Sequence, residues 1–168
     1  MTRYVKQWDE FSCGPIAVLN ARKRVGRRTT IQRDYRKLRE LTGTWYVSLD
    51  DCGSWLKGLH RTIRSCEEIR ARRTKNRTSR NVQRHLRKGG AAIVSVRALF
   101  RKDRGLEDHV MLAIGMSKSG KSVALVNRYP PIFPTVSWAR RATFARYMKK
   151  RKQVGYRDPH VWLISKKK

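Results

Sequence analysis

The segment 7-QWDEFSCGPIAVLN-20 joins a glutamine, a cysteine followed by Gly and Pro, and the start of an apolar run. Pro15 suits the first turn of a helix, because the N–H that proline lacks would have no partner there. Gly26 is a typical helix stop, so we expect a helix over about residues 14–24. Cys13 would then lie at the positive end of the helix dipole, which favours the reactive thiolate.

The charge of the chain is its most unusual property. The 168 residues include 41 Lys or Arg against 12 Asp or Glu, a formal net charge of +29 at pH 7. Such a surface repels itself unless an anionic partner screens it, and nucleic acid is the leading partner for it. An acidic protein and an anionic membrane surface are the less favoured alternatives. The hydrophobic fraction of 39% is enough to bury the core of one domain.

One stretch concentrates the positive charge. Residues 69–88 hold nine Arg or Lys and no acid, whereas a surface selected only for solubility usually mixes both signs. We expect residues 70–80 to be the one disordered insertion. The candidate nucleic-acid-binding residues are Arg70, Arg72, Arg73, Lys75, Arg77, Arg80, Arg84, Lys149, Lys150, Arg151 and Lys152.

Targeting signals and metal-binding patterns are absent from the sequence. The first ten residues, MTRYVKQWDE, contain no apolar core of a secretory signal, and no apolar run is long enough to insert into a bilayer. The three cysteines, Cys13, Cys52 and Cys66, form no CxxC pair. We therefore expect free thiols in a reducing compartment, with no metal site and no cofactor.

The remaining pattern predicts helices first and strands second. The further expected helices are residues 29–43, 48–61, 79–89 and 137–152. The expected strands are residues 91–99, 109–116, 122–129 and 160–165, and Lys166–Lys168 form a solvated tail. This order predicts one α+β domain over residues 1–168, with N-terminal helices packed on an antiparallel sheet and a basic C-terminal helix, strand and tail.

A nucleophilic cysteine needs a base, and the chain offers four histidines. His60 and His85 lie in basic helical stretches and are expected at the surface, and His160 lies near the C-terminal end. His109 opens an apolar strand, and Asn127 ends the next one. Antiparallel neighbours joined by a short turn would place these two residues side by side, so that the amide could hold one histidine tautomer.

Gln7 completes the candidate set, because its side-chain amide and the Cys13 backbone N–H could form an oxyanion hole. Each of the four residues also has a structural interpretation. A lone buried cysteine is usually packing, His109 could be a satisfied edge residue, Asn127 a turn residue and Gln7 a surface residue. Asp108 is not expected to orient His109, because strand neighbours point to opposite faces.

The other cysteines and the C-terminal aromatic residues have structural interpretations too. Cys52 follows two Asp residues, which disfavour its thiolate, and Cys66 is likewise expected to be structural. Trp138, Phe144 and Tyr147 could stack on bases, but at helical spacing they are more often core residues.

The order Gln7, Cys13-Gly14, His109 and Asn127 resembles the papain-like cysteine peptidases, and within them the C39 and C39-like group. The resemblance covers about residues 5–130. It implies that Cys13 is the nucleophile, His109 the base, Asn127 the orienting residue and Gln7 the oxyanion donor. The C39 group has Asp where this chain has Asn127, but other papain-like branches use Asn.

This resemblance leads to three functional hypotheses. The first is a cysteine peptidase that acts on a peptide or protein through a thioester, held on nucleic acid or another polyanion in a larger assembly such as a virus particle. The second is a catalytically silent structural or nucleic-acid-binding protein on the same fold. The third is acyl transfer, in which an amine captures the thioester. The expected location is a reducing intracellular compartment or a virus particle.

Overall fold

The structure is a computed structural model that describes residues 2–7, 12–27, 29–42, 45–48, 51–53, 56–74, 78–99, 106–128, 134–148 and 160–166. Its helices are α1 (Cys13–Arg24), α2 (Ile31–Thr42), α3 (Leu56–Ser65), α4 (Ser79–Arg87) and α5 (Arg141–Tyr147). Its strands are β1 (Trp45–Ser48), β2 (Asp51–Gly53), β3 (Ile69–Arg73), β4 (Ala91–Leu99), β5 (Leu106–Met116), β6 (Ser122–Val126), β7 (Val136–Arg140) and β8 (His160–Lys166).

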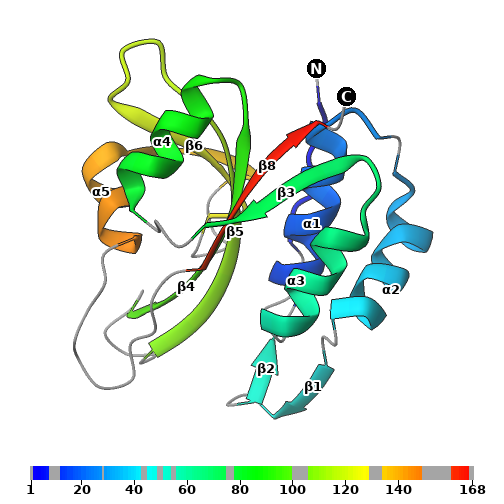
Figure 1. Cartoon of the computed structure of the whole chain (residues 1–168). Helices are drawn as coiled ribbons and strands as arrows, with labels where there is room; N and C mark the ends of the chain where they lie inside the picture. The colour runs from blue at the N-terminus through cyan, green and yellow to red at the C-terminus, as the bar shows by residue number, and fades with distance from the viewer. Residues whose placement is uncertain are drawn as a thin grey trace.

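A six-stranded antiparallel sheet in the order β3-β8-β4-β5-β6-β7 forms the centre of the fold, which confirms the predicted α+β class. The last strand of the chain, β8, lies between β3 and β4 (Figure 1). Ile93 of β4 pairs with Trp162 of β8 on one side and with Leu112 of β5 on the other. These large apolar residues form a row across the sheet that explains why the C-terminal strand inserts beside β4.

Helices cover both faces of this sheet, as Figure 1 shows. Residues of α1, α2 and α3 form one core cluster with alternate strand residues such as Ile93 and Leu112. Residues of α4 and α5 form a second cluster with the strand residues between them, such as Val94 and Met111. The period-two alternation of strand side chains therefore divides the core into two layers.

The predicted first helix is confirmed as α1, and it is the helix most enclosed by its neighbours. Every residue from Cys13 to Ala21 is buried, because α1 packs on β4 and β5 and also against α2 and α3. The chain leaves the helix through Gly26, whose φ of +92° is a conformation that glycine adopts without a Cβ clash. No helix among the described residues is long and apolar enough to cross a membrane.

The predicted helix over residues 137–152 is wrong in its first part. Residues 136–140 form β7, in which Val136, Trp138 and Arg140 are exposed and the residues between them are buried. The main chain of β7 pairs with β6 in the sheet, and this ladder replaces the helical hydrogen bonds. The helix starts only at Arg141, and residues 149–152 lie outside the described part.

Two other segments differ from expectation. Residues 48–61 contain the end of a β1–β2 hairpin before α3 begins at Leu56, rather than one helix. Of the expected disordered insertion at residues 70–80, residues 70–73 belong instead to strand β3, which pairs with β8, and residues 79–80 begin α4, while residues 75–77 lie outside the described part. A strand forms there because Ile69 and Ala71 pack on the α1 side of the sheet while the arginines of the strand stay exposed. The N-cap of α4 is Thr78, whose side chain accepts a hydrogen bond from the Asn81 N–H.

Candidate active site

Cys13 occupies the first position of α1, directly after the N-cap residue Ser12. Its side chain is 5% exposed, within the core cluster that α1 shares with the sheet. The first turn of α1 contains no acidic residue that would oppose a thiolate. Because α1 packs on β5, the cysteine lies on the helix that contacts the strand of His109.

His109 is buried at 4% exposure, and its ring is fixed by one main-chain oxygen. The Nε2 atom lies 2.8 Å from the carbonyl oxygen of Asn127. A carbonyl oxygen only accepts hydrogen bonds, so Nε2 carries the proton and donates it, and Nδ1 keeps the lone pair. Burial lowers the pKa of His109 to about 4, although the bond to Asn127 opposes that shift. The imidazole is therefore neutral at pH 7, and Nδ1 is its basic atom.

Asn127 follows the last residue of β6 and has a φ of +53°. This left-handed conformation is one that asparagine tolerates better than most residues. Its N–H still bonds to the Thr135 carbonyl on the β7 side, while its own carbonyl accepts from His109. Asn127 thus contacts the histidine through its main-chain carbonyl, whereas the prediction assigned this contact to its side-chain amide.

The amide of Asn127 holds the N-terminal segment instead. Its Oδ1 accepts from the Gln7 backbone N–H at 3.1 Å, and its Nδ2 donates to the Val5 carbonyl at 3.0 Å. An aspartate could not make the second bond, because a carboxylate has no proton to donate. This geometry gives a physical reason for Asn at the position where the C39 pattern has Asp.

A second asparagine, which the sequence reasoning missed, holds the same segment from the other side. Asn20 of α1 is completely buried; its Oδ1 accepts from the Val5 N–H at 2.7 Å and its Nδ2 donates to the Val5 carbonyl at 2.9 Å. The signal was an asparagine within the apolar run AVLNA, because a buried amide needs hydrogen-bond partners. We call Asn20, Asn127 and Val5 the asparagine clamp.

The structure thus brings three of the four predicted residues together. Gln7 and His109 both bond directly to Asn127, and the clamp ties this group to α1, which begins at Cys13. The catalytic roles assigned to these residues stay predictions.

Two histidines expected at the surface are half-buried and bonded. The Nδ1 atom of His60 accepts a hydrogen bond from the Trp162 indole N–H at 3.0 Å. The Nε2 atom of His85 lies 2.9 Å from the Ile164 carbonyl. The expectation was wrong because α3 and α4 both pack against the sheet through their histidine-bearing faces.

Cys66 is a buried thiol of a different kind. Its S–H donates to the Thr62 carbonyl at 3.3 Å, and burial raises its pKa to about 11. It is therefore protonated and unreactive at neutral pH, in keeping with the structural role predicted for it. Cys52 lies in β2, and its side chain is outside the described part of the structure.

The candidate nucleic-acid-binding residues lie on β3 and α4 where they are described. Those that are described are all exposed: Arg70, Arg72, Arg73, Arg80 and Arg84. Those that lie outside the described residues are Lys75, Arg77, Lys149, Lys150, Arg151 and Lys152.

Of the three aromatic residues considered for base stacking, only one is openly exposed. Phe144 is fully buried in the core. Tyr147 accepts a hydrogen bond from Arg128 at 3.2 Å, with the guanidinium 6.0 Å from its ring centroid. Trp138 is 55% exposed and remains available for contact with a partner.

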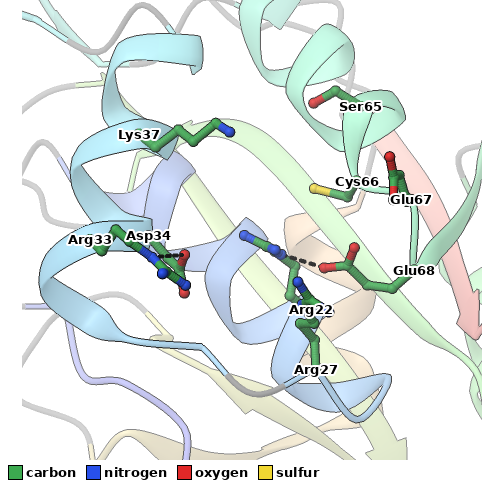
Figure 2. A pocket seen from close by; sticks show the side chains of 9 residues that line it. All are labelled: Arg22, Arg27, Arg33, Asp34, Lys37, Ser65, Cys66, Glu67 and Glu68. Atoms are coloured by element: carbon green, nitrogen blue, oxygen red, sulfur yellow. Dashed lines mark hydrogen bonds and ion pairs between the residues drawn. The ribbon is translucent and has the colours of Figure 1, made fainter.

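A pocket of about 850 Å³ lies far from Cys13, between the C-terminal end of α1, α2 and the turn from α3 to β3 (Figure 2). Arg22 forms an ion pair with Glu68 across the pocket, and the Nε atom of Arg33 lies 3.6 Å from Oδ1 of Asp34. Asp34 also accepts the Thr30 N–H at the start of α2. The Arg22–Glu68 pair joins α1 to the turn between α3 and β3. Within the described ranges, no group of three or more His, Cys, Asp or Glu residues is placed to hold a metal ion.

Comparison with known proteins gives matches in structure only. No protein-family model and no curated protein matches the chain. The peptidase domain of Streptococcus ComA, a bifunctional ABC transporter involved in quorum sensing, matches with a TM-score of 0.62 and 14% identity, over 97% of this chain and 98% of that one. A putative C39-like peptidase from Bacillus anthracis matches with a TM-score of 0.61 and 13% identity, over 99% and 95%. The chain therefore has the papain-like cysteine peptidase fold of the C39 domains, as its sequence pattern predicted.

Proposed function

We propose that the protein is a papain-like cysteine peptidase that hydrolyses a peptide bond through a thioester on Cys13. The observation that carries the proposal is the bonding at Asn127. This residue joins the base His109 and the Gln7 segment at the end of β6, beside the helix that begins at Cys13. The C39 fold supports the same assignment.

The proposed reaction follows from the tautomer of His109. Its Nδ1 takes the proton of the Cys13 thiol, and the thiolate attacks the peptide carbonyl carbon. The Cys13 N–H and the Gln7 side-chain amide stabilise the oxyanion of the tetrahedral intermediate. The amine leaves with the proton from the imidazolium, and a water deprotonated by His109 then hydrolyses the thioester. An amine in place of that water would give acyl transfer.

We test the catalytic pair by alkylation with a low dose of iodoacetamide between pH 4 and 9, followed by mass spectrometry. Cys13 should react faster in the folded wild-type protein than in folded His109→Gln, because Nδ1 of His109 takes the proton of the thiol. Cys66 serves as an internal control in the same sample, because its pKa near 11 keeps it protonated. If Cys13 reacts at the same rate in both folded proteins, the proposed pair does not exist.

Peptide cleavage is the direct test of activity. The wild-type protein should cleave members of a mixed peptide library, and Cys13→Ala should cleave none. Added hydroxylamine would capture the thioester as a hydroxamate, which would identify the covalent intermediate and the capacity for acyl transfer. An alkylation-competent Cys13 with no cleavage of any peptide would favour the silent alternative.

Association with nucleic acid is the second part of the proposal, and the virus particle or another nucleic-acid-rich assembly is the setting that we propose. The net charge of +29 and the exposed arginines of β3 and α4 support it, because catalysis on a peptide requires neither. The same observation favours the alternative of a silent nucleic-acid-binding protein. Binding should weaken steeply with salt, and Arg70→Gln with Arg80→Gln should reduce the log–log salt slope by about 2. If the double variant has the same salt slope as the wild type, these arginines do not contact the nucleic acid.

A further inference from the structure

A chain of four side chains lies on the α1 side of the sheet, outside the residues that the proposed reaction uses. Trp162 of β8 donates its indole N–H to His60 of α3 at 3.0 Å. His160 stacks on Trp162 with ring centroids 6.3 Å apart, and its Nδ1 lies 2.9 Å from a guanidinium nitrogen of Arg73. We call Arg73, His60 and His160 the donor cluster.

The hydrogen bonds fix both imidazole tautomers in the donor cluster. The indole N–H and the guanidinium can only donate, so Nδ1 of His60 and Nδ1 of His160 are both acceptors. In a neutral ring the remaining proton is then on Nε2. Each neutral histidine therefore carries its proton on Nε2, and Arg73 has further N–H groups beside them.

The charge around the donor cluster is positive. Burial lowers the pKa of His60, and the cations Arg73 and Arg64 lower it further, which places the Arg73 charge near His60 as well as near His160. Arg73 is exposed and both histidines are half-buried, so a ligand can reach the cluster. One full cation with two neutral N–H donors suits a carboxylate, which accepts several hydrogen bonds at once.

The sheet register places the donor cluster near the candidate active site. His160 of β8 pairs with Ser95 of β4, and Ser95 pairs with Val110 of β5, which belongs to the core cluster that contains Cys13. Two strand spacings separate β8 from β5, about 10 Å. An extended peptide covers that distance in about three residues. Trp162 belongs to the same core cluster as Cys13, so the donor cluster lies on the nucleophile's side of the sheet.

We infer that the donor cluster is a substrate subsite that binds a carboxylate about three residues from the scissile bond. The inference rests on the proposed function, since it interprets the carboxylate as part of a peptide substrate. The carboxylate is supplied either by an Asp or Glu side chain or by a free C-terminus. The proposed peptidase would then prefer acidic peptides or chain ends, a preference consistent with its own positive charge.

A catalytically inactive protein separates this inference from the proposed function. Cys13→Ala protein with ¹⁵N-labelled histidine is titrated with acetyl-Ala-Ala-Glu-Ala-Ala-amide and with the same peptide carrying Gln. A third probe, acetylated penta-alanine with a free C-terminus, is compared with its amide. The readouts are the dissociation constant and the ring ¹⁵N shifts of His60 and His160.

The carboxylate peptide should bind about tenfold more tightly than its neutral twin, as for a charge-assisted hydrogen bond, and should shift both rings. Arg73→Gln should abolish the difference, and His160→Phe, which keeps the ring on Trp162, should reduce it. Lys118→Gln removes an exposed cation at the turn between β5 and β6 and should leave the difference intact.

The three peptide comparisons have distinct meanings. Preference for the Glu peptide alone assigns the subsite to an acidic side chain, and preference for the free C-terminus alone assigns it to a chain end. Equal binding of charged and neutral twins, or an equal loss in Arg73→Gln and Lys118→Gln, overturns the inference. If the preference holds but the wild-type protein cleaves no peptide, the carboxylate site stands and the proposed peptidase activity fails.

Discussion

The buried His109 makes a direct prediction about how the stability of the protein depends on pH. The ring is 4% exposed, and its pKa is lowered from 6.5 to about 4. The unfolded chain regains the ordinary value, so between these two pH values the unfolded state binds the proton that the folded state rejects. Protonation therefore favours unfolding as the pH falls.

The size of the effect follows from the two pKa values. The stabilisation is fully present above pH 6.5, is lost as the pH falls from 6.5 to about 4, and is gone below that value. The difference corresponds to about 3 kcal/mol of unfolding free energy from this one residue. Such a loss is a large fraction of the stability of an ordinary domain, which is typically about 5–15 kcal/mol.

Urea denaturation of the wild type and of His109→Gln at intervals from pH 4 to 8 measures this effect. Glutamine does not titrate, and its amide can still donate to the Asn127 carbonyl. The variant curve should therefore be flatter, with the difference between the two proteins changing by about 3 kcal/mol over the range. Other groups with lowered pKa values, such as His60 and Glu68, are present in both proteins and cancel in the comparison. Parallel curves would refute the buried, neutral state of His109.

Three further changes probe the surroundings of the site. Asn127→Asp should lower the unfolding free energy by about 1–3 kcal/mol, because the Val5 carbonyl would lose one of its two donors and face a carboxylate, with only Asn20 still donating to it; an unchanged urea midpoint would contradict the clamp. Gly90→Ala should lower the melting temperature, since its Cβ would lie 2.2 Å from the His85 Nε2 atom, which the sheet holds in place; an unchanged temperature would show that the ring moves freely. Cys66 should resist alkylation at pH 8 until urea unfolds the protein, because burial raises its pKa to about 11; equal labelling rates in both states would show that the thiol is not buried.

The sequence predicted those parts of the fold that local chemistry specifies. Pro15 and Gly26 bound α1 as helix signals do, and the apolar runs along the chain identified the central strands. The failures lie where distant pairing overrides local preference. Residues 137–140 were predicted to be helical because a helical stretch follows them, but their main chain pairs with β6. The strand character of residues 69–73 was hidden by charge, because arginines at alternate positions occupy an exposed face.

In the candidate site, too, the sequence predicted what strand pairing specifies and missed what single hydrogen bonds decide. Spacing along the chain placed His109 and Asn127 together, because neighbouring antiparallel strands bring such positions side by side. Sequence does not specify which atom of Asn127 meets the ring, since that depends on a φ of +53° at one residue. In the asparagine clamp, the buried amide of Asn20 bonds to Val5, which lies 15 positions earlier in the chain. No sequence motif predicts this contact.

The neutral state of His109 changes how the proposed catalytic pair should be understood. A base with a pKa near 4 is weaker than one matched to neutral pH, so a resting thiolate–imidazolium pair is not favoured by the imidazole alone. A negative charge that develops on the Cys13 sulfur would raise the pKa of the ring, because opposite charges at close range stabilise each other. The basicity of His109 would then rise as the Cys13 thiol ionises. The positive charge of the protein would favour the thiolate. The same charge would oppose protonation of His109 as long as the thiol stays uncharged.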